Sequence, residues 1–263
     1  MYMRLFYSCV FVLLLCACSR EGETITFETI TVDKTVPLSN DSIPPTCSVN
    51  IHLEKATPES GRAGEIINAT VANRLMNRSD DGLQEAAEAF AKEYTNNYIK
   101  TLLPLYNQDR KDLNKHAWYH YHYIINSHTQ AGSKGTIVYL ANINYRQGGN
   151  HVVNQQIVMN FEASTGRLLT TKDIFVDGFE ARLKKILLKA LKENTGLRSL
   201  KALHKKGYLK GMDIFVPENF ILSNDAITFI YNPDEIGPYS LGTTELTIAY
   251  TAMSKILNSS FEH

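Results

Sequence analysis

The sequence predicts an α+β fold, with two helices packed on antiparallel β-sheets in two closely associated subdomains. Hydrophobic residues follow helical periodicity over 83–106 and 177–196, and they alternate with a period of two through 116–161. Helices and strands that occupy separate stretches are typical of α+β architecture. The 263 residues are 44% hydrophobic and 21% charged, which is enough to bury such a core and excludes a disordered chain.

The charge balance argues against a nucleic-acid partner. The chain holds 27 Lys and Arg against 27 Asp and Glu, whereas nucleic-acid binding needs a basic surface. The charges are nevertheless uneven along the chain. Residues 182–210 hold ten Lys or Arg and one acid, and residues 211–263 hold seven acids and one Lys. If the fold keeps these stretches apart, the protein has two faces of opposite charge, and the acidic one could steer a basic partner.

The first 17 residues have the layout of a lipoprotein signal peptide. Arg4 precedes an apolar run of 13 residues, which is shorter than the ~20 that span a membrane. The run ends in Leu15-Cys16-Ala17-Cys18, which resembles a bacterial lipobox and implies that Cys18 carries the lipid. A plain secretory signal cut after Ala17 is the alternative. We therefore expect a protein of the cell envelope, lipid-anchored to a bacterial membrane and facing the periplasm or the cell surface.

The cysteines agree with this interpretation. Cys9 and Cys16 would leave with the signal peptide and Cys18 would carry the lipid, so Cys47 is the one free thiol of the mature chain. Cys47 could act as a nucleophile, but a small buried residue at the start of a strand is favoured.

The mature chain begins with a predicted tether, residues 18–45, rich in Ser, Thr and Pro. The alternation over 24–32 indicates an edge strand as the alternative. An N-terminal α+β subdomain follows over 46–160, and Pro104 should end or kink its long helix. Its expected strands are 47–53, 116–126, 136–145 and 155–161, and its expected helices are 66–76 and 83–106.

Residues 161–263 form the predicted C-terminal subdomain, of the sensing type. Its helix should start at Asp177, which would cap the free amides together with Glu180 in a capping box, and should end at Gly196 before a basic loop. The other expected elements are strands at 168–169, 220–222, 226–231 and 246–250 and a short helix at 252–257.

Four short motifs occur in a fixed order in the second half of the chain. They are Gly148-Gly149-Asn150-His151, Thr165-Gly166-Arg167, Asp173-Ile174-Phe175 and Glu235-Ile236-Gly237-Pro238-Tyr239. The series resembles a bacterial envelope domain of unknown function. That domain is best known as the lysozyme-sensing extracytoplasmic region of the anti-sigma-V factor, and it also occurs as an accessory region of some peptidoglycan deacetylases. The resemblance implies lysozyme binding. In this sequence we recognise neither the segment that holds a sigma factor nor a deacetylase domain.

The loop over 234–244 is the predicted partner-binding site. It holds Asp234, Glu235, Pro238, Tyr239 and Leu241, and rigid prolines beside an amphipathic tyrosine suit recognition. Alternatively, these residues only shape and pack the loop.

The motif at Gly148, Gly149 and His151 predicts a tight turn. Its histidine could act as a catalytic base, although a local hydrogen bond is the favoured role.

Three histidines have spacings that a metal site can use. His116 and His120 are four residues apart, and His120 and His122 are two apart. The glutamate that a zincin motif needs after the first histidine is absent, and a two-faced aromatic strand that includes Trp118 explains the pattern without metal. We therefore expect no metal and no other cofactor.

These observations predict a non-catalytic envelope lipoprotein with a binding module. The favoured partner class is lysozyme or a similar muramidase. One alternative is a module that binds cell-wall glycan, such as peptidoglycan, through aromatic residues near Trp118. The other is a metal-dependent envelope hydrolase that uses His116, His120 and His122.

Overall fold

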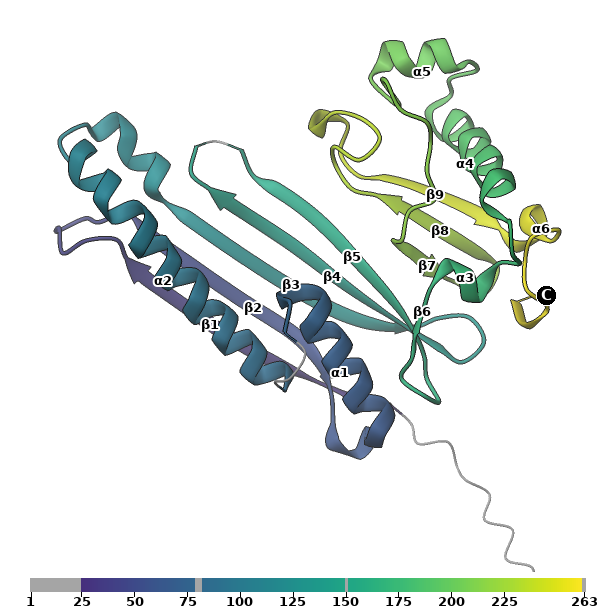
Figure 1. Cartoon of the computed structure of the whole chain (residues 1–263), viewed down its shortest axis with the longest axis horizontal. Helices are drawn as coiled ribbons and strands as arrows, with labels where there is room; N and C mark the ends of the chain where they lie inside the picture. Colours follow the sequence, from purple (N-terminus) through teal and green to yellow (C-terminus); the bar gives the residue numbers. More distant parts are fainter. Residues whose placement is uncertain (1–24, 79–81, 150, 262–263) are drawn as a thin grey trace, which may run out of the picture.

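The structure, a computed structural model, describes residues 25–78, 82–149 and 151–261, which form a six-stranded sheet, a three-stranded sheet and the helices that cover them (Figure 1). The predicted α+β fold is confirmed. Within the described ranges, no helix has both the length and the apolar character needed to cross a membrane. The predicted signal peptide and Cys18 lie outside these ranges.

The six-stranded sheet follows the order of the chain. Its strands are β1 (Phe27–Pro37), β2 (Thr46–Ala56), β3 (Tyr121–Ala131), β4 (Thr136–Gln147), β5 (Val153–Glu162) and β6 (Leu168–Leu169). Neighbouring strands are antiparallel except β2 and β3, which run parallel. A parallel pair needs a long crossover, and the two helices between these strands provide it.

Residues 27–37 lie within the predicted tether, but they form strand β1. β1 pairs with β2 along its whole length, from Phe27 opposite Ala56 to Pro37 opposite Thr46. Ile30 is buried in the main core, and Val32 and Val36 pack against this core. The alternation of apolar and polar residues in the sequence is therefore that of a strand at the edge of a sheet.

Helices α1 (Gly61–Met76) and α2 (Leu83–Asp109) cover one face of this sheet (Figure 1). α1 begins five residues before the expected 66. Pro104 was expected to end or kink α2, but the helix continues to Asp109. Pro104 is exposed, so water can reach the backbone carbonyl that its missing N–H leaves without a helical partner.

The three-stranded sheet consists of β7 (Phe220–Leu222), β8 (Ala226–Tyr231) and β9 (Thr244–Ala249). The apolar stripe of α4 (Glu180–Thr195) packs into the same core as Phe220, Leu222 and Phe229. Short helices α3 (Thr171–Ile174), α5 (Leu200–Lys206) and α6 (Tyr250–Met253) complete this part. α5 lies in the segment expected to be a basic loop, and α6 is shorter than the predicted helix over 252–257.

The predicted capping box at α4 is not formed. α4 begins at Glu180 after Phe179, without a side-chain cap. The capping box lies at α3 instead, where the Asp173 carboxylate accepts the backbone N–H of Thr170 at 2.8 Å. The expected subdomain boundary at 160/161 also falls inside β5, and the two large cores meet at Leu168 and Leu169.

Three asparagine side chains join β5 to the second sheet. The Asn232 amide accepts the N–H of Gln156 at 2.7 Å and donates to its carbonyl at 3.0 Å. The Asn219 amide accepts the N–H of Val158 at 3.1 Å and donates to the same Gln156 carbonyl at 3.0 Å.

Asn160 makes the reciprocal contact from β5 to β7. Its amide donates to the carbonyl of Phe220 at 2.6 Å and accepts the N–H of Leu222 at 3.1 Å. A side-chain amide holds both a donor and an acceptor, so the three amides take the place that a neighbouring strand would occupy.

A small apolar cluster lies behind these amides. It consists of Val138, Leu140, Val158 and Ile230, with Ile221 packed against them. Val138 and Leu140 alternate along β4 with Tyr139 and Ala141, which belong to the core under the helices. The second sheet therefore packs on the face of β4 and β5 that α1 and α2 leave uncovered.

We expect Asn160→Ala to lower the free energy of unfolding by roughly 2–5 kcal/mol, because it leaves a buried carbonyl and a buried N–H without partners. Urea unfolding measures this. Asn142→Ala is the matched control, since Asn142 is an exposed residue of β4 and should change stability by less than ~0.5 kcal/mol. Equal stability of the two variants would contradict the role given to Asn160.

Candidate functional site

The candidate site is the end of the six-stranded sheet opposite to the start of β1. We call it the distal rim, and it consists of residues 38–45, 113–120, 147–149, 151–152 and 232–242. The start of β1 pairs with the end of β2. The 11 residues of β1 then run to the turn at 38–45, which lies roughly 36 Å from the start of β1. The turn after β1 and the turn after β4 both lie at the end of the six-stranded sheet that is away from the start of β1 (Figure 1).

Two motifs that the sequence singled out separately meet on this rim. The rings of His151 and Tyr239 lie with their centroids 4.7 Å apart. The Tyr239 hydroxyl oxygen accepts a hydrogen bond from the Asn154 amide at 2.8 Å. Gly148 lies against the rim as well, since a Cβ on it would be 2.7 Å from the carbonyl oxygen of Trp118. The turn after β4 and the loop after β8 therefore form one surface.

Other residues of the predicted binding loop hold the loop in shape. The Glu235 carboxylate accepts the backbone N–H of Asn232 at 2.8 Å. Pro238 and Leu241 pack against Gly207, where a Cβ would lie 3.1 Å from Pro238. Asp234 and Pro238 are exposed and Tyr239 is half-buried, so these three can meet a partner.

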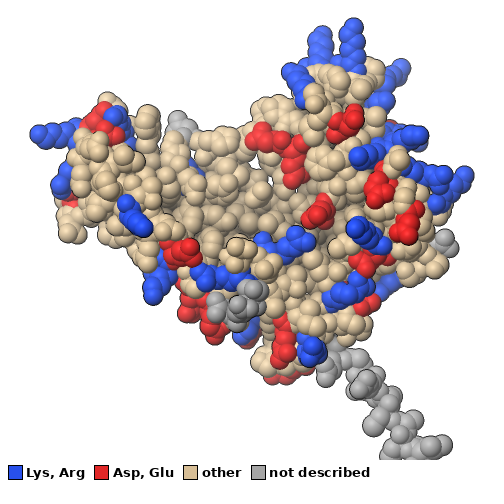
Figure 2. Space-filling model, viewed as in Figure 1, with Lys and Arg blue, Asp and Glu red and all other residues tan. Residues whose placement is uncertain are grey.

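The charges on this side of the molecule are not separated in space as their order along the chain suggests. The N–H of Leu209 donates to the carbonyl of Ile236 at 2.7 Å, which places the acidic loop beside the basic segment 182–210. Figure 2 shows Lys and Arg crowded over α5, with acidic side chains interspersed nearby. The attraction of Asp234 and Glu235 for a basic partner is therefore partly offset.

The other half of the rim exposes several large apolar side chains. The most exposed large apolar side chains of the rim are Ile43 at 84%, Leu113 at 77% and Trp118 at 59%. Leu105, near the end of α2, adjoins the rim and is 49% exposed. The Asp41 carboxylate fixes the turn to α2, because it accepts from the Tyr106 hydroxyl at 2.8 Å and pairs with Arg110. These four make up half of the eight large apolar side chains exposed in the described residues, and such clustering marks interaction surfaces.

The three histidines do not form a metal site. Residues 113–119 form a short 3-10 helix, η2 (Leu113–Tyr119), because the Asp112 carboxylate accepts the N–H of Asn114 and turns the backbone. β3 begins only at Tyr121, so the strand predicted from 116, with its histidines on one face, is wrong. In the described part of the chain, no three His, Cys, Asp or Glu side chains come close enough to hold a metal ion.

Each imidazole instead has its own partner. His116 lies 3.1 Å from the carbonyl of Arg110, and His122 lies 2.8 Å from the side-chain oxygen of Asn144. His120 accepts the backbone N–H of Thr46 at 3.3 Å, and burial lowers its pKa, so it accepts as the neutral ring.

Cys47 is buried in β2. Burial raises the pKa of its thiol to about 12, so the thiolate that a nucleophile needs is almost absent at neutral pH.

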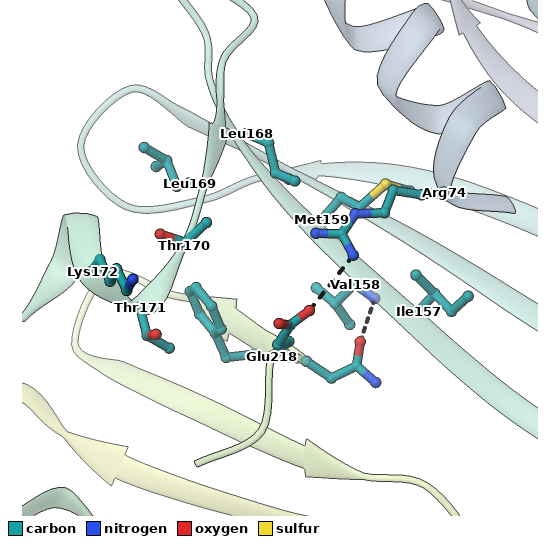
Figure 3. A pocket seen from close by; sticks show the side chains of 12 residues that line it. Arg74, Ile157, Val158, Met159, Leu168, Leu169, Thr170, Thr171, Lys172 and Glu218 are labelled. Atoms are coloured by element: carbon teal, nitrogen blue, oxygen red, sulfur yellow. Dashed lines mark hydrogen bonds and ion pairs between the residues drawn. The ribbon is translucent and has the colours of Figure 1, made fainter. Parts of the chain in front are cut away.

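A cavity of about 310 Å³ lies between the two sheets. Its lining comes from α1, β5, the segment 168–172 and the segment 218–220 (Figure 3). Sequence reasoning missed it because α1, the region 157–172 and the segment 218–220 are far apart in the chain and none of the lining stretches holds a recognisable motif.

Comparison with known proteins identifies a domain but no activity. Residues 172–251, from α3 to α6, match the family model described as a protein of unknown function, DUF3298. This stretch of the chain is therefore similar to a DUF3298 domain. A search of curated proteins found no match.

Two crystal structures resemble the whole fold. A DUF3298 family member from Bacteroides fragilis NCTC 9343 is 28% identical, with a TM-score of 0.83, over 91% of this chain and 96% of that one. A DUF3298 family protein from Pseudomonas aeruginosa PAO1 is 17% identical, with a TM-score of 0.63, over 91% and 98%. The likeness to the second shows the shared fold alone.

We expect Cys47 to resist Ellman's reagent at pH 8 in the folded protein, because the thiol is inaccessible and protonated. The measurement is the absorbance of released thionitrobenzoate, with and without denaturing urea, on the chain from residue 18 with Cys18→Ser. One thiol should react in urea. Rapid reaction of the folded protein would show that Cys47 is accessible, contrary to this structure.

Proposed function

We propose that the protein is a non-catalytic recognition module of the bacterial cell envelope, anchored to a membrane by a lipid on Cys18, which binds a partner protein through the distal rim. The direction of β1 is the observation that carries this proposal. Residues 18–24 can span at most ~25 Å, so the anchor would lie near the start of β1. The rim would stand roughly 36 Å farther out, facing away from the membrane.

The chemistry of the rim supports protein recognition. Exposed Trp118 and Leu113 offer apolar contact area, and Tyr239 and His151 add rings that each carry a polar atom. Aromatic side chains of this kind supply most of the binding energy in many protein interfaces. Two acids near the rim are already paired with cations, Asp41 with Arg110 and Asp109 with Lys115.

Lysozyme or a similar muramidase is the partner class that we propose. The support is the resemblance of the four motifs to the sensing region of the anti-sigma-V factor, which the comparisons leave open. Because the acidic loop lies against the basic segment, we attribute binding to the apolar and aromatic rim rather than to long-range attraction. Salt should therefore weaken it less than the charge pattern of the sequence suggests.

Binding of cell-wall glycan is the second candidate, and the exposure of Trp118 favours it. The neighbouring tyrosines do not extend this platform. Tyr121 lies 5.3 Å from Tyr98 and Tyr123 lies 5.1 Å from Phe90, ring to ring, so both pack beneath α2. Pulldown on purified peptidoglycan separates the two candidates, because only a glycan-binding module is retained on it without a protein partner.

We expect Cys18→Ser to move the protein from the membrane fraction to the soluble fraction, because the lipid has no other attachment point in this proposal. Fractionation of the producing bacterium with immunoblotting measures this. Cys16→Ser is the matched control and should leave the protein on the membrane. If both variants partition alike, Cys18 is not the anchor.

We expect saturable binding of lysozyme, and Trp118→Ala or Tyr239→Ala should each weaken it about tenfold or more by removing a rim contact. Isothermal titration calorimetry on the chain from residue 18 with Cys18→Ser gives the dissociation constants. Val176→Ala is the control, because Val176 is 40% exposed but lies outside the rim. An absence of binding, or an equal effect of the control, would reject lysozyme recognition at the rim.

A further inference from the structure

The cavity between the two sheets has the size of a small ligand. Taking the ~30 Å³ that each molecule occupies in liquid water, about 310 Å³ holds on the order of ten non-hydrogen atoms. It lies near the lower limit of known small-molecule sites. Elements of both sheets and helix α1 line it, so a ligand here would touch both halves of the fold.

The buried residues of the cavity lining are apolar. They are Val158, Met159, Leu169 and Phe220. Ile157 and Leu168 are half-buried and line its sides. The Asn219 amide also lines it, but its oxygen and nitrogen are already bonded to the backbone of Val158 and Gln156. The buried part of the cavity lining therefore suits a hydrocarbon chain.

The mouth of the cavity is charged. Arg74 of α1 and Glu218 reach toward each other across it (Figure 3), with 3.5 Å between the guanidinium and the carboxylate. Their side chains are 46% and 89% exposed, so this ion pair contributes little stability. Lys172, the other charged residue of the lining, is exposed. Arg74, Lys172 and Glu218 together leave the lining with one net positive charge.

We propose that this cavity binds a small monocarboxylate with an unbranched apolar chain of about eight carbons. The chain lies on Ile157, Leu168 and Phe220, and the carboxylate takes the place of Glu218 on Arg74. Three observations fit this class: the volume, the apolar buried lining and a cation whose present partner is an exposed, weakly held carboxylate. One negative charge also balances the single positive charge of the lining.

The test is calorimetric titration of the chain from residue 18, carrying Cys18→Ser, with octanoate, octanol and octylamine. Octanoate should bind most tightly, because only its head group pairs with Arg74. Between hexanoate and octanoate, each methylene should raise the affinity up to ~4-fold. A flat dependence on chain length, or octanol binding as tightly as octanoate, would overturn the proposal.

Two substitutions locate the binding site. Arg74→Met should weaken octanoate binding at least tenfold and leave octanol binding unchanged. Glu218→Gln should tighten octanoate binding several-fold, because it removes the competing carboxylate. Arg62→Met is the control on the same helix, since Arg62 is exposed and does not line the cavity. An Arg62→Met variant that behaves like Arg74→Met, or unchanged octanoate binding in Arg74→Met with normal urea unfolding, would overturn it.

Discussion

The pairing of side-chain amides with backbone along the open edge of β5 is the contact on which the rest of the structure depends. Without Asn219 and Asn232, the polar groups of Gln156 and Val158 would form an unpaired strand edge next to an apolar cluster, and without Asn160 the carbonyl of Phe220 and the N–H of Leu222 in β7 would lose their partner. Asn232 also begins the loop that carries Tyr239, and Asn219 lines the cavity. One set of hydrogen bonds therefore places the second sheet, half of the rim and the ligand-sized space between the sheets.

Periodicity in the sequence predicts α2, α4 and β9 well, because each has a single buried face. β1 is harder to predict because most of its side chains are exposed and only Ile30 is fully buried, so its composition resembles a tether. At α4 the capping signal of Asp177 is present but unused, since Phe179 is buried in the core and fixes where the helix begins. Tertiary packing outweighs local capping there.

The site is predictable only in pieces. Turn and loop chemistry identifies His151 and Tyr239 separately, but their contact depends on hydrogen bonds between segments far apart in the sequence. The charge pattern is misleading for the same reason, because the acidic loop folds back on the basic segment through Leu209 and Ile236. The histidines mislead in another way: Asp112 turns the chain into η2, which removes His116 from the strand. The first two outcomes depend on contacts between segments far apart in the sequence, and the third depends on the single side chain of Asp112.

The full-length pairing of β1 with β2 has a mechanical consequence for a protein held at one end. In the proposed arrangement, a partner on the rim and an anchor before residue 25 pull along the axis of β1 in opposite directions. The hydrogen bonds between Phe27–Pro37 and Thr46–Ala56 are then loaded together in shear, instead of opening one after another. A ladder loaded in this way yields at a much higher force than one peeled from its end. β1 would therefore transmit tension from the rim to the membrane while the domain stays folded.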